Sequence, residues 1–183
     1  MRVIAGIYGG RRLRTPPGPA IRPTSDRLRE TLFNVLTPDI EGASFLDICA
    51  GSGAAGIEAL SRGAAASTFV EVSRRACSAI EANLAMLGID SEAQIVNRDA
   101  VKAIKWLAGQ DQRFDIVFFD PPYSSGIYSQ VMQTVADSGV LAPGGVLVVE
   151  HRVKTPPAPE YGELRIYRHI EQGESGLAFY SRV

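Results

Sequence analysis

The stretch SFLDICAGSGAAG, residues 44–56, decides the fold. It begins with a short apolar run that predicts a strand at 44–48, and it continues into glycines spaced Gly-x-Gly-x-x-Gly from Gly51 to Gly56. Glycine allows a sharp turn and a close approach of the backbone to a ligand. A glycine loop between a strand and a helix, here expected at 54–62, indicates the first unit of a parallel α/β sheet.

The rest of the chain continues this alternation of strand and helix. Short apolar runs predict strands at 67–71, 93–97, 114–120 and 145–150, and periodic apolar residues predict helices at 74–87, 100–107 and 127–138. Two last strands, at 164–170 and 177–182, flank a glycine-containing turn and predict a hairpin. We therefore expect an α/β, Rossmann-like fold with a mostly parallel seven-stranded sheet and an antiparallel C-terminal strand.

A basic segment precedes the sheet. Residues 1–30 contain seven arginines and two acidic residues, a local charge of +5, although the formal net charge of the whole chain is -1. The segment predicts a small β-hairpin around a glycine pair, a proline-rich linker and a helix at 27–36. We divide the chain into an N-terminal appendage, 1–40, and a domain, 41–183. Because arginine binds phosphate through paired hydrogen bonds, the charge predicts an anionic partner for the appendage.

The composition limits the remaining classes of protein. No run of about 18 apolar residues could span a membrane, and the first residues lack the layout of a signal peptide. Cys49 and Cys77 have no metal-ligand spacing, so we expect buried free thiols and no metal. These features favour a cytoplasmic protein without a membrane partner.

A second decisive motif ends the strand at 114–120. Pro121 cannot donate a ladder hydrogen bond, so the strand stops there, and Pro122 keeps the backbone extended. Asp120 and the ring of Tyr123 are therefore expected at the carboxyl end of a buried strand. Ligands of open α/β sheets bind at that edge, although the same residues would also suit a plain strand end and turn.

The glycine loop leaves two classes of cofactor open. Glu71 stands twenty residues after Gly51, which is the spacing of a dinucleotide-binding loop with an acid on the ribose. Asp47 argues against NAD or FAD, because its carboxylate would face a pyrophosphate without an intervening cation. S-adenosylmethionine has no phosphate and carries an ammonium and a sulfonium group, so it suits this loop better. Asp99 could accept from the adenine amino group, cap the helix at 100–107, or do both.

Three segments together resemble the RsmD family of 16S rRNA (guanine-N2)-methyltransferases. They are RPTSDRLRETLFN at 22–34, LDICAGSGAAGIEALSRGA at 46–64 and DPPY at 120–123. The family is one of the class I S-adenosylmethionine-dependent methyltransferases. The resemblance implies methyl transfer to the N2 amine of a guanine in 16S rRNA, within the small ribosomal subunit or its assembly intermediate.

The resemblance also implies roles for individual residues. The Asp120 carboxylate and the Pro121 carbonyl would accept the two hydrogens of the target amine, and Tyr123 would stack on the base. The expected catalytic residues are Asp120, Pro121, Pro122 and Tyr123. The expected cofactor-binding residues are Thr24, Arg27, Asp47, Ala50, Gly51, Ser52, Gly53, Glu71, Val72, Asp99, Ala100 and Asp120. Phosphate contacts with RNA are expected from Arg11, Arg12, Arg14 and Arg22.

Three alternatives stay open at this point. The same motif would serve a DNA adenine-N6 or cytosine-N4 methyltransferase, although 183 residues leave little room for a target-recognition domain. A non-catalytic RNA-binding factor of ribosome assembly could retain the fold, but it would not need both motifs. The third alternative is a nucleotide-dependent oxidoreductase. The glycine spacing supports it, and Asp47 argues against it.

Overall fold

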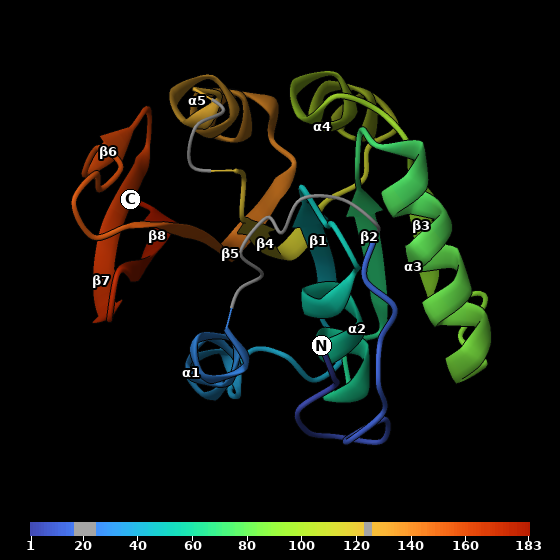
Figure 1. Ribbon diagram of the computed structural model, residues 1–183. Coiled ribbons are helices and arrows are strands. Elements are labelled where there is room, and N and C mark those ends of the chain that lie inside the picture. The colour runs from blue at the N-terminus through green and yellow to red at the C-terminus, as the bar shows by residue number, and fades with distance from the viewer. Residues whose placement is uncertain (17–24, 123–125) are drawn as a thin grey trace.

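The computed structural model describes residues 1–16, 25–122 and 126–183 (Figure 1). These residues form an eight-stranded sheet with the strand order β3-β2-β1-β4-β5-β8-β7-β6. The strands are β1 Ser44–Ile48, β2 Ala66–Val70, β3 Ala93–Val96, β4 Phe114–Phe119, β5 Leu141–Arg152, β6 Glu160–Tyr161, β7 Leu164–Gln172 and β8 Ser175–Arg182. The helices are α1 Asp26–Leu36, α2 Ala54–Ser61, α3 Arg74–Leu87, α4 Ala100–Gly109 and α5 Tyr128–Ser138.

The direction of the strands confirms the predicted mostly parallel sheet. β1 pairs in parallel with β2 and β4, β2 with β3, and β4 with β5. β8 then pairs antiparallel with both β5 and β7, as the C-terminal hairpin predicted. Parallel strands place all their carboxyl ends at one edge of the sheet, and that edge is where a ligand is expected.

The largest differences between the sheet and the expectation concern β6 and β5, and the other strand ends shift by at most two residues. The described residues contain an eighth strand, β6, which pairs antiparallel with β7 over two residues and is too short to carry an alternating pattern. β5 begins at Leu141, four residues before the expected start at 145. The sequence predicted a later start because Pro143 and Gly144 are typical of a turn. A register shift between Phe114 and Ile116 of β4 accommodates the additional residues.

Helices cover both faces of the sheet (Figure 1). α1, α2 and α3 pack on one face around Phe45, Phe69 and Phe118, and α4 and α5 pack on the other around Val117 and Phe119. Neighbouring residues of β4 thus point into opposite cores, as the alternation of side chains along a strand requires. None of these described helices is long and apolar enough to cross a membrane.

The N-terminal residues form the predicted hairpin, which is short. Arg2 and Arg12 make a single antiparallel bridge, and Val3 donates its N–H to the carbonyl of Arg11 at 2.9 Å. Val3 and Leu13 are buried in the same core as α1 and α2. The hairpin and α1 therefore pack directly on the sheet layer, and a domain boundary after residue 40 stays a prediction.

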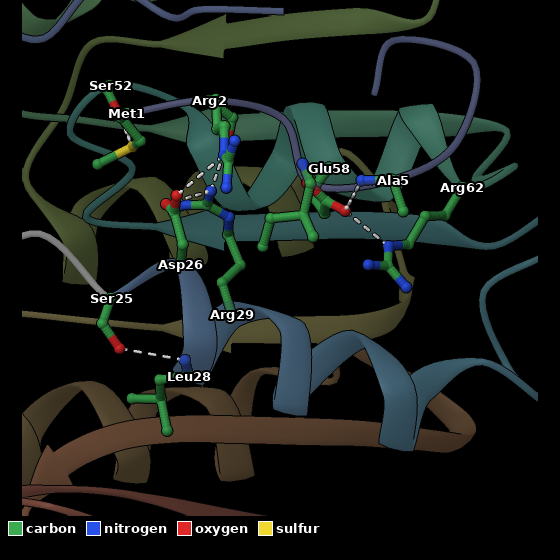
Figure 2. A network of polar contacts seen from close by, with 11 residues as sticks. Met1, Arg2, Ala5, Ser25, Asp26, Leu28, Arg29, Ser52, Glu58 and Arg62 are labelled. Carbon is green, nitrogen blue, oxygen red and sulfur yellow. Dashed lines mark hydrogen bonds and ion pairs between the residues drawn. The ribbon is translucent and has the colours of Figure 1, made fainter. Parts of the chain in front are cut away.

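A buried carboxylate fixes the hairpin to α2. Glu58 is fully buried and accepts hydrogen bonds from the N–H groups of Ile4 at 2.7 Å and Ala5 at 3.0 Å. Arg62, the C-cap of α2, lies one turn further on, and its Nε donates to the same side chain at 2.7 Å (Figure 2). All three contacts stabilise the buried carboxylate charge of Glu58. They therefore hold Ile4 and Ala5 in one position against α2.

Candidate active site at the carboxyl edge of the sheet

The ends of β1, β2 and β4 meet at one edge of the sheet. Ile48 is in register with Val70 on one side and with Phe119 on the other. Glu71 directly follows the last residue of β2, and Asp120 directly follows the last residue of β4. The N–H of Asp120 donates to the carbonyl of Ile48 at 3.3 Å. The glycine loop, Glu71 and Asp120 are therefore neighbours in space, as the sequence predicted.

The three glycines of the loop have different structural roles. Gly51 has a φ of 57°, and a Cβ added to it would find its nearest neighbour at 4.0 Å, so this part of the loop is open to a ligand. Gly53, with a φ of 77°, is the N-cap of α2. A Cβ on Gly56 would lie only 2.3 Å from Cε1 of Phe69. The third glycine therefore allows α2 to pack closely on β2.

Cys49 is a strained residue that the sequence did not reveal. Its φ of 67° lies in the left-handed region, which is unfavourable for a residue other than glycine. Its N–H and that of Ala50 both donate to the carbonyl of Val70 at 3.0 Å, and these contacts hold the turn between β1 and the loop. Burial, together with the nearby charge of Glu71, raises the pKa of the Cys49 thiol, so this residue is not an activated nucleophile.

Asp47 is buried beneath the loop. Its Oδ2 accepts a hydrogen bond from the N–H of Gly56 at 3.0 Å, which ties β1 to α2. Burial raises the pKa of its carboxyl group to about 7, although the Gly56 N–H opposes this change, and the charge of Glu71 raises the pKa further. Asp47 thus has a definite role in holding the loop, and its contact with a cofactor stays a prediction.

Glu71 connects the loop with the start of α3. One carboxylate oxygen accepts from the N–H of Gly51 at 2.9 Å, and the other accepts from the N–H of Ser73 at 2.8 Å. Each oxygen can accept a further hydrogen bond, so the side chain retains capacity for ribose hydroxyls. The adjacent Val72 is an apolar side chain that remains 69% exposed, which is suitable for contact with the face of a base.

The other predicted cofactor residues differ in exposure. Asp99 is exposed and is the N-cap of α4, where its Oδ1 accepts from the N–H of Lys102 at 3.2 Å. The capping role is confirmed, and a contact with adenine stays a prediction. Ala50, Ser52 and Ala100 are buried, so only their backbones or small side chains would line a ligand site.

The predicted catalytic and RNA-binding residues are only partly described. Pro121 is buried and Pro122 is exposed directly after Asp120, which has intermediate exposure. Arg11, Arg12 and Arg14 on the hairpin and Arg27 on α1 are all exposed. Tyr123, Thr24 and Arg22 lie outside the described residues.

Arg29 is a residue whose position the sequence did not indicate. It counted there as one of seven basic residues near the N-terminus, but its side chain is only 1% exposed. Its Nη2 donates to the carbonyl of Arg2 and, at 3.1 Å, to Oδ1 of Asp26 (Figure 2). Burial lowers the pKa of its guanidinium group, while Glu58 and Asp26 oppose this change. The only signal in the sequence is the spacing of three residues from Asp26 on one helix face.

The fold and this edge can now be compared with known proteins. A sequence model of the family described as "Conserved hypothetical protein 95" matches residues 1–181. The chain belongs to this family. It is the RsmD family, so the resemblance seen in the motifs is confirmed.

Individual members agree with this assignment. "Ribosomal RNA small subunit methyltransferase D" of Escherichia coli (strain K12) is 39% identical over 188 residues, and the match covers 96% of this chain and 93% of the relative. "Putative rRNA methyltransferase YlbH" of Bacillus subtilis (strain 168) is 34% identical over 182 residues, covering 100% and 99%. The solved structure "Putative methyltransferase yhhF from Escherichia coli" has a TM-score of 0.83 at 37% identity, covering 100% and 97%.

The protein is thus an RsmD-family methyltransferase with S-adenosylmethionine as its cofactor. The residues at the edge fit that cofactor. Asp47, Glu71 and Asp99 provide carboxylates, which suit hydroxyl, amino and ammonium groups. Glu71 would suit the ribose of either class of cofactor, so the choice against a dinucleotide rests on Asp47, whose carboxyl group beneath the loop is unfavourable for a pyrophosphate.

Proposed function

We propose that this protein transfers a methyl group from S-adenosylmethionine to the exocyclic N2 amine of a guanine in 16S rRNA of the small ribosomal subunit. The observation that carries the proposal is the position of Asp120 and Pro121, one strand away from the glycine loop at the same edge. The relative named for ribosomal RNA of the small subunit, at 39% identity, supports the choice of substrate.

The cofactor would lie across the ends of β1, β2 and β3. Glu71 would accept from the ribose hydroxyls, Asp99 from the adenine amino group, and Val72 would contact the adenine face. Asp47 would offset the charge of the ammonium group from beneath the loop. The remaining residues assigned to the cofactor are Thr24, Arg27, Ala50, Gly51, Ser52, Gly53, Ala100 and Asp120. When bound, S-adenosylmethionine supplies an electrophilic methyl group.

The chain itself would orient the amine. The Asp120 carboxylate and the Pro121 carbonyl would each accept one of its hydrogens, which turns the nitrogen lone pair toward the methyl group. Such positioning of two reactants accounts for a large part of many rate enhancements. Pro122 would keep the backbone rigid, and Tyr123 would stack on the base. Asp120 or water would take the proton after the nitrogen has become cationic, so no strong base is required.

The hairpin arginines would bind RNA. Arg11, Arg12 and Arg14 are exposed cations on a segment that Glu58 fixes to α2, so their positions are defined before RNA binds. Arg22 would belong to the same contact. Each phosphate that such a residue neutralises makes binding more sensitive to salt.

The substrate can be tested directly. The protein is incubated with labelled S-adenosylmethionine and, in parallel, with undermodified small subunits, naked rRNA and duplex DNA, and the labelled nucleoside is identified by mass spectrometry. The proposal predicts N2-methylguanosine in 16S rRNA. Label in a DNA base, or in a different RNA nucleoside, would overturn it.

A further inference from the structure

A group of three cations lies on α4 and just before its first residue. Arg98, Lys102 and Lys105 are exposed, and no ion pair within the described residues involves any of them. By contrast, Arg62, Arg165 and Arg182 each contact a glutamate. Residues 98–106 contain three cations and one carboxylate, Asp99, which gives a local charge of +2 in a chain whose formal net charge is -1.

The three cations share one surface. Lys102 and Lys105 are three residues apart on α4, and Trp106 is four residues from Lys102, so all three side chains lie on adjacent positions of one helix face. The guanidinium of Arg98 lies 4.7 Å from the centre of the Trp106 ring, so Arg98 joins this helix face. Lys102 and Trp106 are about 6 Å apart along the helix axis.

This surface begins at the candidate active site. Arg98 follows Asn97, whose Nδ2 donates to the carbonyls of Glu71 at 2.9 Å and Val72 at 3.0 Å. Asp99 separates Arg98 from the start of α4 and is engaged in capping it. Figure 1 shows α4 next to α5, on the face of the sheet opposite α1 and α2 and away from the N-terminal hairpin. The cations therefore extend outward from the proposed cofactor site on the side that the hairpin arginines do not reach.

We propose that Arg98, Lys102 and Lys105, with Arg98 seated on Trp106, bind the phosphate groups of RNA that extends past the proposed adenine side of the cofactor site. This inference rests on the proposed function and adds a second RNA contact to that of the hairpin. Like charges at this spacing repel one another, and a strand of phosphates relieves that repulsion and releases counterions. Trp106 packs its other side against the core, so Arg98 is held in place before RNA arrives.

The test measures RNA binding as a function of salt. The double variant Lys102→Gln/Lys105→Gln should lower the slope of log affinity against log salt by about 1 to 2, because each lost phosphate contact accounts for about 0.7 to 0.9. KM for RNA should rise while kcat at saturating RNA and the cofactor Kd stay unchanged, since neither side chain approaches the reacting atoms. Arg113→Gln is the matched control, because this exposed cation precedes β4 at the opposite edge of the sheet.

The outcomes separate the two proposals. A wild-type protein that methylates no rRNA overturns the proposed function itself. A wild-type protein that methylates rRNA, with the same salt slope in the double variant, overturns only the α4 contact. A slope lowered equally by Arg113→Gln would also overturn it, because the effect would then be one of general charge.

Discussion

Replacing Asp47 by asparagine should change how the stability of the protein depends on pH. The carboxyl group has a pKa of about 7 in the folded protein, where burial disfavours the charge, against an ordinary value of 3.8. The folded state therefore binds a proton more tightly than the unfolded state does. This stabilisation is fully present below about pH 4 and is lost as the pH rises through about 7.

The expected size follows from these two values. The interval between 3.8 and about 7, at about 1.4 kcal/mol per pH unit, corresponds to about 4 kcal/mol in total. About 2 to 3 kcal/mol of that change should occur between pH 5 and pH 8. Asparagine keeps an oxygen that accepts from the Gly56 N–H but cannot ionise, so the variant lacks this part of the pH dependence.

Urea unfolding of the cofactor-free proteins between pH 5 and pH 8 measures the difference. The free energy of unfolding of wild type should fall relative to that of Asp47→Asn by the amount given above. Parallel curves for the two proteins would refute the reasoning. The proposed contact with the cofactor's ammonium group adds a second expectation. The Asp47 carboxyl group is about half protonated at pH 7. Cofactor binding at that pH should therefore release up to about half a proton from wild type and none from the variant, as calorimetry in two buffers would detect.

Other substitutions test the packing and the proposed ligand contacts. Gly56→Ala should cost about 1 to 3 kcal/mol of stability, because the new Cβ would meet Phe69 at 2.3 Å. Gly109→Ala, where a Cβ would have nothing within 4 Å, should be nearly neutral. Equal urea midpoints for the two variants would contradict this. Glu58→Gln should cost about 3 kcal/mol and hasten proteolysis of the N-terminal segment, since it breaks a buried ion pair; unchanged cleavage would count against the role of this residue. Glu71→Gln should weaken cofactor binding about tenfold by calorimetry, through loss of a charged hydrogen-bond acceptor; an unchanged Kd would exclude the ribose contact.

The sequence predicted the sheet because its signals are local. Each predicted parallel strand is a short apolar run, and the Gly51-to-Gly56 spacing specifies the turn that follows the first of them. Parallel pairing then brings the strand ends together, so Glu71 and Asp120 could be expected at one edge. β6 was missed because two residues carry no periodicity.

The details that the sequence could not provide depend on tertiary contacts. Arg29 is indistinguishable from the exposed arginines until the hairpin covers it and supplies the carbonyl of Arg2. The positive φ of Cys49 is imposed by the two hydrogen bonds to Val70. Asp47 was expected to serve a ligand, and its bond to Gly56 becomes visible only when α2 packs on β1.

The most direct test compares the rate of methyl transfer to 16S rRNA by wild type and by Asp120→Ala in a single turnover. Cofactor binding is measured in parallel. If Asp120 orients the guanine amine, the variant should retain its fold and bind the cofactor, yet transfer the methyl group to guanine N2 at least about a hundredfold more slowly. Transfer at the wild-type rate, with the label still in N2-methylguanosine, would contradict the central claim.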